Sequence, residues 1–213
     1  NVSDDDVSDE SVDDDWLNRW RENAQDVSVE QIQAVWGRIL TEEVKSPGSY
    51  SIGTLEFLRT ISKNEALKIA EIGPYVLFNG TFVFRDKPFL ESREISFSKL
   101  LDLQELGILS GADAVGLSWS LNSAVEDVFS NAIVAYGKVL VVDREAREPP
   151  MTLPVYRITK RGREILGLGN VMPDEEYIKH VGAQIKSLGF RVHYGDLVRN
   201  QETGAGVENA VEL

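Results

Sequence analysis

The sequence contains two segments with clear helix and strand signals, Lys99-Leu-Leu-Asp-Leu-Gln-Glu-Leu-Gly-Ile-Leu109 and Val155-Tyr-Arg-Ile-Thr-Lys-Arg-Gly-Arg-Glu-Ile165. The first predicts a short helix over residues 98–106 that ends at Gly107, because glycine readily adopts the left-handed conformation that closes a helix. Ile108 then turns back toward the core. The second predicts a strand over residues 155–158, followed by a basic helix over residues 160–166 with Thr159 as its N-cap.

The flanking segments predict more strands and one long helix. Residues 75–78 and 81–84 surround Asn79-Gly80, a dipeptide that favours a type I′ turn, so we expect a β-hairpin there. Residues 132–142 and 190–194 have strand-like patterns, and residues 148–152 are expected to form a loop. A helix is expected from Pro173-Asp174 to Gly189. We expect the polar residues 199–213 to form a flexible tail.

Four helices are expected in the N-terminal third of the chain, because helix-capping signals recur there. The first helix is expected to begin at Trp16 and the fourth at Lys63. Trp16, Trp20 and Trp36 stand at helical spacings, so we expect a core between the first two helices rather than a ligand cage. The capping signals are Asp13–Asp15, Ser28 with Gln31, Ser51, and Ser62 with Glu65.

The two stretches quoted first resemble the second half of a winged-helix domain, in which a helix ends, two wing strands follow and a threonine begins the closing helix. A wider set of motifs consists of Asp14-Asp-Trp-Leu-Asn-Arg19, Ala24-Gln-Asp-Val27, Gln33-Ala-Val-Trp-Gly-Arg-Ile-Leu40, Pro47-Gly48-Ser49 and Thr54-Leu-Glu-Phe-Leu58. With these motifs, most of residues 13–198 is similar to a bacterial family catalogued as domain of unknown function 2806. This resemblance implies a fold and a bacterial origin, and carries over no activity, cofactor or catalytic residue.

Together these features predict an α+β fold, in which an N-terminal helical bundle packs on a winged-helix-like domain and a C-terminal helix and strand follow. The expected segments are an acidic disordered lead-in (1–13), a helical region (14–72), a winged-helix-like α+β region (73–170), the C-terminal helix and strand (171–198) and the flexible tail (199–213).

The charge is strongly negative and unevenly distributed. The 213 residues contain 35 acidic and 22 basic side chains, a net charge of -13. Residues 1–15 hold eight of the acids and no base, so the remainder has 27 acids against 22 bases, a net of -5. A polyanion repels nucleic acid, which is therefore disfavoured as a partner unless it contacts the basic wing and its helix. The candidate nucleic-acid or anion contacts are Arg144, Arg147, Arg157, Lys160, Arg161 and Arg163.

The composition leaves little catalytic chemistry. The chain has no cysteine, which excludes disulfides, thiolate zinc sites and cysteine nucleophiles. His180 and His193 are the only histidines, and neither belongs to a metal-binding motif. Gly116-Leu-Ser118-Trp-Ser120 lacks the final glycine of a nucleophile elbow and is better interpreted as a strand. We therefore expect no catalytic residue, no metal site and no cofactor.

These observations favour a non-catalytic bacterial protein-interaction or sensor module that binds a protein partner or forms a homo-oligomer. Two alternatives stay open: a winged-helix DNA-binding regulator that uses the basic wing, and a hydrolase in which a carboxylate and a histidine meet in space. No apolar run approaches the roughly 20 residues of a membrane helix, and the acidic start lacks the apolar segment of a signal peptide. We therefore expect a cytoplasmic protein with no membrane partner.

Overall fold

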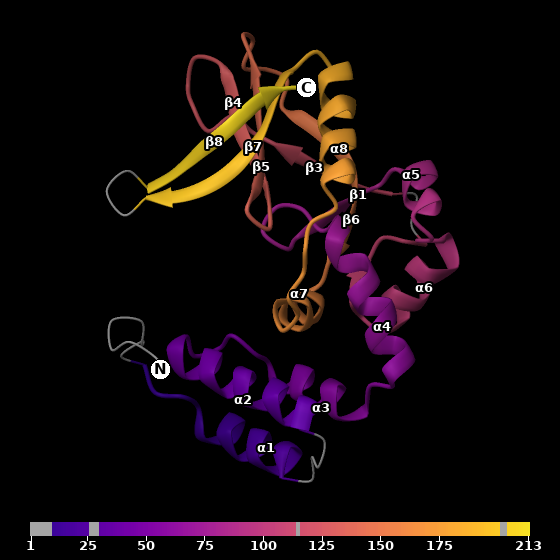
Figure 1. Cartoon of the computed structure of the whole chain (residues 1–213), viewed down its shortest axis with the longest axis vertical. Helices are drawn as coiled ribbons and strands as arrows, with labels where there is room; N and C mark the ends of the chain where they lie inside the picture. Colours follow the sequence, from indigo (N-terminus) through magenta and orange to yellow (C-terminus); the bar gives the residue numbers. More distant parts are fainter. Residues whose placement is uncertain (1–9, 26–29, 114–115, 201–203) are drawn as a thin grey trace. The chain divides into compact units, whose positions relative to one another are not determined.

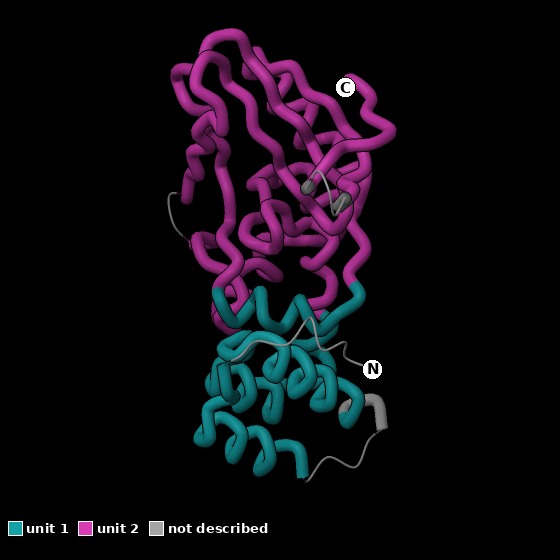
Figure 2. Tube along the Cα trace, turned by 90° about the vertical axis from the view of Figure 1, so that its left-hand side faces the viewer, with its two compact units in different colours: residues 1–67, 160–170 teal, residues 68–159, 171–213 magenta. Residues whose placement is uncertain are grey.

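The computed structural model describes residues 10–25, 30–113, 116–200 and 204–213 (Figure 1). The chain forms two compact units, each made of two segments (Figure 2). Unit 1 consists of residues 1–67 and 160–170, and unit 2 of residues 68–159 and 171–213. None of the helices in the described ranges is long and apolar enough to cross a membrane.

Unit 1 is helical. Its helices are α1 (Asp14–Ala24), α2 (Glu30–Lys45), α3 (Ile52–Thr60), the start of α4 (Lys63–Ile72) and α7 (Lys160–Gly167). Asp13 caps α1 as predicted, because its side chain accepts a hydrogen bond from the Trp16 amide at 2.9 Å. The predicted capping box is also present: the Ser62 amide donates to Glu65, and the Glu65 amide donates to Ser62. The cap predicted at Ser28 lies outside the described residues.

The predicted tryptophan core of unit 1 is confirmed. Trp16 and Trp36 are buried, and Trp20 packs against them. The indole N–H of Trp16 donates to the Tyr50 carbonyl at 2.7 Å, and that of Trp20 donates to the Trp36 carbonyl at 3.0 Å. The polar atoms of both rings are thus satisfied inside an apolar cluster. Leu168, directly after α7, belongs to the same cluster, so a segment far along the chain completes the N-terminal core.

Unit 2 contains two antiparallel sheets. In the first sheet, β6 (Met151–Ile158) pairs with β1 (Phe82–Phe84), β2 (Leu109–Ser110) and β3 (Leu117–Leu121). The second sheet has the order β4 (Phe129–Ala135), β5 (Lys138–Arg144), β7 (Arg191–Asn200), β8 (Gly204–Glu212). The helical elements are η2 (Gly73–Tyr75), α5 (Lys87–Ser92), α6 (Phe97–Glu105) and α8 (Glu175–Ser187).

Helix α8 packs against β7 and β5 of the second sheet (Figure 1). Asp174 caps it by accepting a hydrogen bond from the Tyr177 amide at 2.9 Å, and Gly189 follows it with a φ of 88°. Both helix-end signals predicted from the sequence are therefore correct. Tyr177 is fully buried, and its hydroxyl bonds to both backbone groups of Phe84, which fastens α8 to β1.

Three predicted strand regions differ in the structure. The hairpin expected over residues 75–84 is wrong: Tyr75 ends a 3₁₀ helix, and only an isolated bridge joins Leu77 to Phe82. Phe78, Asn79 and Gly80 all have positive φ, so the turn is longer than a two-residue type I′ turn. Residues 82–84 instead form β1, which pairs with β6, a strand far away in the sequence.

The strand expected over residues 132–142 is a hairpin, in which Tyr136 and Gly137 adopt φ angles of 46° and 85° between β4 and β5. The predicted loop over 148–152 is wrong at its end, since β6 already begins at Met151. The predicted flexible tail is wrong over residues 204–212, which form β8 and pair with β7. An edge strand can be polar and contain glycine, because only one of its sides pairs with the sheet. Strand β8 therefore lacks the apolar alternation by which a buried strand is predicted from sequence.

The mixed helical and antiparallel-sheet architecture is confirmed, and the winged-helix arrangement is not. One local detail predicted there is present, since Gly107 follows α6 with a φ of 71°. Helix α7 begins directly after Thr159, whose hydroxyl donates to the Gly107 carbonyl at 2.6 Å. However, the strand segments expected within 132–142 and 155–158 belong to different sheets and do not pair as one wing.

Candidate functional site

The six basic residues predicted as anion contacts do not form one group. Arg144, Arg147 and Arg157 belong to unit 2, whereas Lys160, Arg161 and Arg163 lie together on α7 in unit 1.

Arg144 has a structural role in unit 2. Its guanidinium donates to the Ala146 carbonyl at 2.8 Å and to the Pro149 carbonyl, and lies 4.4 Å from the ring centroid of Phe190. These contacts hold the loop between β5 and β6 and use much of the donor capacity that an anion would need. Arg147 and Arg157 are exposed.

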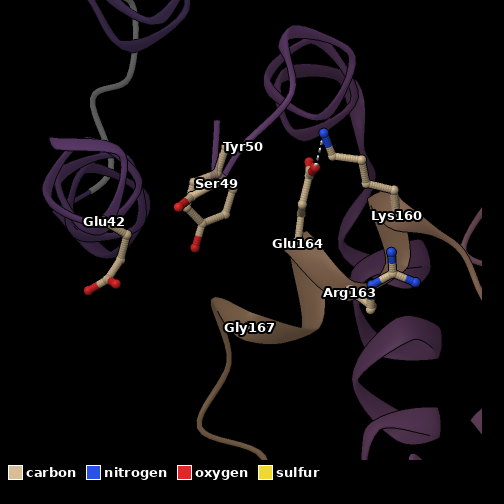
Figure 3. Close-up of a pocket in the computed structure, with 7 residues that line it drawn as sticks. All are labelled: Glu42, Ser49, Tyr50, Lys160, Arg163, Glu164 and Gly167. Carbon is tan, nitrogen blue, oxygen red and sulfur yellow. Dashed lines mark ion pairs between the residues drawn. The ribbon is translucent and has the colours of Figure 1, made fainter. Parts of the chain in front are cut away.

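The basic residues of α7 have different surroundings. The guanidinium of Arg161 lies 5.2 Å from the ring centroid of Phe57 in α3, a cation–π contact within unit 1. Lys160 and Arg163 instead line a cavity of about 360 Å³. Its walls come from α2, from the loop before α3 and from α7 (Figure 3). The lining residues are Glu42, Ser49, Tyr50, Lys160, Arg163, Glu164 and Gly167.

Glu164 is the unusual residue of this cavity, because its carboxylate is buried although it lies on a basic helix. Its Oε2 accepts hydrogen bonds from the amide and the hydroxyl of Ser51, each at 3.0 Å. Its Oε1 is buried and has no hydrogen-bond partner. The ammonium of Lys160, one helical turn earlier, lies 3.7 Å from Oε1 (Figure 3). Sequence reasoning missed Glu164, and the one available signal was an acid four residues after a lysine.

Glu43 fixes the loop that forms the opposite wall. This carboxylate is 2% exposed and accepts hydrogen bonds from the amides of Gly48 at 2.6 Å and Tyr50 at 2.9 Å. Burial raises the pKa of the Tyr50 phenol, and the nearby carboxylates of Glu42 and Glu164 raise it further. Because its pKa is raised, the Tyr50 phenol stays protonated at neutral pH.

The two histidines lie in different surroundings. In unit 2, His180 Nε2 lies 2.8 Å from Asp86 Oδ2, and the imidazole stacks on Phe89 with 4.5 Å between ring centroids. Burial alone would raise the pKa of Asp86, but the bonds from His180 and from the Phe89 amide hold it below its usual value. His193 is paired with Val141 and Glu212 in the second sheet. In the described ranges, no three His, Cys, Asp or Glu side chains are placed to hold a metal ion.

The β8 edge of the second sheet, with which no other strand of the described residues pairs, is the other candidate surface. Strand β8 ends the strand order, and Val207 and Val211 on it are 38% and 58% exposed. Glu208 and Glu212 are exposed on the same strand. Sequence reasoning missed this edge, because the segment was interpreted as a tail. Residues 204–213 contain no lysine, arginine or histidine.

Comparisons with known proteins relate the N-terminal part of the chain to a family. No curated protein and no solved structure matches the chain. Residues 1–77 match the model of a family described as Protein of unknown function (DUF2806). The matched segment contains α1, α2, α3 and α4, and all five N-terminal motifs that carry the resemblance. Over its first 77 residues, the chain is similar to this family of unknown function.

Proposed function

We propose that the chain is a non-catalytic protein-interaction module of bacterial, cytoplasmic origin, and that β8 receives an extended basic segment of a partner protein. The observation that carries this proposal is an edge of a four-stranded sheet that pairs with no other strand among the described residues and has two exposed valines. Proteins commonly protect such edges with lysine, proline or a covering element, because an unpaired strand recruits other strands. Strand β8 contains neither lysine nor proline.

The backbone of β8 supports strand addition. The Leu213 amide donates to the Val192 carbonyl of β7 at 3.0 Å. Because consecutive residues of an antiparallel strand point their backbone groups to opposite sides, the amide and carbonyl of Glu212 point away from β7. A partner strand can therefore bond to the outer side of β8 at its C-terminal end, beyond the irregularity at Asn209, where the pairing with β7 shifts register.

The charge of β8 favours a basic partner. Glu208 and Glu212 are exposed, and no cation stands among residues 204–213. A second copy of the chain would bring the same acids opposite one another, which is unfavourable across paired strands. A strand with lysine or arginine would instead gain opposite-charge pairs and faster association.

A peptide titration tests this proposal. A fluorescein-labelled peptide of alternating lysine and threonine should bind the wild-type chain, and its glutamate and threonine counterpart should not. The double substitution Glu208→Lys and Glu212→Lys should abolish binding. The matched control is Glu145→Lys with Glu148→Lys, which makes the same charge change in an exposed loop and should preserve it. Equal binding by both double variants, or a dimer in light scattering that Glu212→Pro dissociates, would contradict the proposal.

One observation favours a second candidate, a hydrolase. Asp86 orients the imidazole of His180 at 2.8 Å, as a carboxylate does for a general base. In this case, His180→Gln would abolish turnover of a nitrophenyl ester or nitrophenyl phosphate. Absence of turnover by the wild-type chain on either substrate class rejects the candidate.

A further inference from the structure

One carboxylate oxygen in the cavity of unit 1 lacks a hydrogen-bond donor. The side chain of Glu164 is 5% exposed, and Ser51 supplies both donors to Oε2. Oε1 has no hydrogen-bond partner. Leaving a buried charged oxygen without a donor is unfavourable, so a cationic donor that reaches Oε1 would gain a charge-assisted hydrogen bond. The cavity that Glu164 lines, about 360 Å³, has the size of a small-ligand site.

The geometry restricts the kind of donor. A guanidinium binds best when both oxygens of a carboxylate are available, but Ser51 already occupies Oε2 twice. A divalent metal ion needs several oxygen ligands, and in the described part of the chain no three acidic, histidine or cysteine side chains converge. A primary ammonium is compact and needs a single oxygen. Glu42 and Arg163, which line the same cavity, have opposite charges, so Glu164 is the carboxylate that would attract the ammonium.

Lys160 already holds an ammonium near this oxygen. Its Nζ lies 3.7 Å from Oε1, beyond hydrogen-bond distance, at the end of a side chain that is 66% exposed. Figure 3 shows the two side chains meeting above α7. Exposed ion pairs between residues four apart in a helix contribute little to stability. The Lys160 side chain can therefore move from Glu164 into the solvent at a small cost in free energy. The side chain therefore acts as a removable occupant.

We propose that this cavity binds the primary ammonium group of a ligand at Glu164 Oε1, in the place that Lys160 occupies in the free protein. This site goes beyond the interaction at β8 and does not depend on it. The ammonium can come from a free amine or from a lysine side chain of a partner, and both present the same group to Oε1.

The test is an NMR titration of the whole chain with methylammonium chloride. The reporter is the Ser51 amide, because its N–H donates to the same carboxylate. This resonance should shift saturably with methylammonium and not with potassium chloride at equal ionic strength. Lys160→Ala removes the competing ammonium, so its affinity for methylammonium should rise about three- to tenfold. Glu164→Gln should lose the response.

The matched control is Lys179→Ala on α8. Lys179 pairs with Glu175, one turn earlier, at 3.9 Å, and the two side chains are 48% and 47% exposed, so this is an exposed lysine pair without a buried carboxylate. This variant should behave as the wild type. Absence of a saturable shift in Lys160→Ala overturns the proposal, whether or not Glu164→Gln folds. So does an unchanged affinity in a Glu164→Gln variant whose spectrum remains dispersed.

A last comparison identifies the source of the ammonium. An acetylated tripeptide with a central lysine is titrated beside methylammonium into Lys160→Ala. Tighter binding of the peptide assigns the site to a partner's lysine side chain, whereas equal binding assigns it to a free amine. Both results support the ammonium site.

Discussion

Buried carboxylates determine the local structure of unit 1. Two buried carboxylates, Glu43 in α2 and Glu164 in α7, bind the segment between α2 and α3. Each of them accepts two hydrogen bonds from this segment. A buried carboxylate is tolerated when donors surround it. The sequence could not predict this use, because Glu43 stands beside the exposed Glu42 in a helix end, and Ser51 is 113 residues away from Glu164.

Removal of Glu43 should destabilise unit 1 strongly. Glu43→Ala leaves the Gly48 and Tyr50 amides without their acceptor, so we expect a loss of about 2–4 kcal/mol in the free energy of unfolding. Urea denaturation followed by tryptophan fluorescence measures it. Glu42→Ala is the control, because the Glu42 side chain is 47% exposed and forms a surface pair with Lys45 at 3.6 Å. Equal losses in the two variants would contradict this account.

A second residue-scale prediction concerns acid stability in unit 2. Lys138 lies 2.8 Å from Asp196 and 3.1 Å from Glu175. The Asn209 amide and then Lys138 lower the pKa of Asp196, and the Tyr194 hydroxyl and then Lys138 lower that of Glu175. Carboxylates with lowered pKa stabilise the fold above their ordinary values of 3.8 and 4.5, and this stability is lost as the pH falls through the lowered values.

Lys138→Met should therefore unfold at lower urea than the wild type at neutral pH, and the difference should shrink on acidification below pH 3.8. Urea midpoints across an acid series measure this. A difference that stays constant or grows at low pH would show that Lys138 does not act through these two carboxylates.

At the scale of elements, the accuracy of sequence reasoning depends on how local the cause is. The helix ends at Asp13, Asp174 and Gly189 were predicted correctly, because capping depends on residues within one turn. The strands were harder, because their partners are distant: β1 pairs with β6 about 70 residues away along the chain, as in Phe84 with Val155.

Two glycines offer a matched test of local backbone conformation. Gly137 turns between β4 and β5 with a φ of 85°, and Gly37 lies inside α2; a Cβ at either would meet nothing within 4 Å. Packing therefore does not interfere. Gly137→Ala should destabilise the chain by about 1 kcal/mol, because alanine disfavours positive φ. Gly37→Ala should stabilise it by about 0.5–1 kcal/mol. Urea unfolding of both variants is the measurement, and the same sign for both would contradict the assignment.

At the scale of the whole molecule, charge argues against nucleic acid. The net charge is -13, the candidate basic residues divide between the two units, and Arg144 and Arg161 already contact other groups. We expect no retardation of duplex DNA in a gel shift at about 50 mM salt, where phosphate contacts are strongest. A shift that Lys160→Ala with Arg163→Ala abolishes would instead establish α7 as a phosphate-binding element.

Amide hydrogen exchange reports, residue by residue, whether a partner strand pairs with the outer side of β8. The Glu212 amide points away from β7, whereas the Leu213 amide already donates to Val192. Saturation with the lysine and threonine peptide should slow exchange at Glu212 by about tenfold or more and leave Leu213 nearly unchanged. Peptide binding that leaves Glu212 exchange unaltered would contradict this pairing.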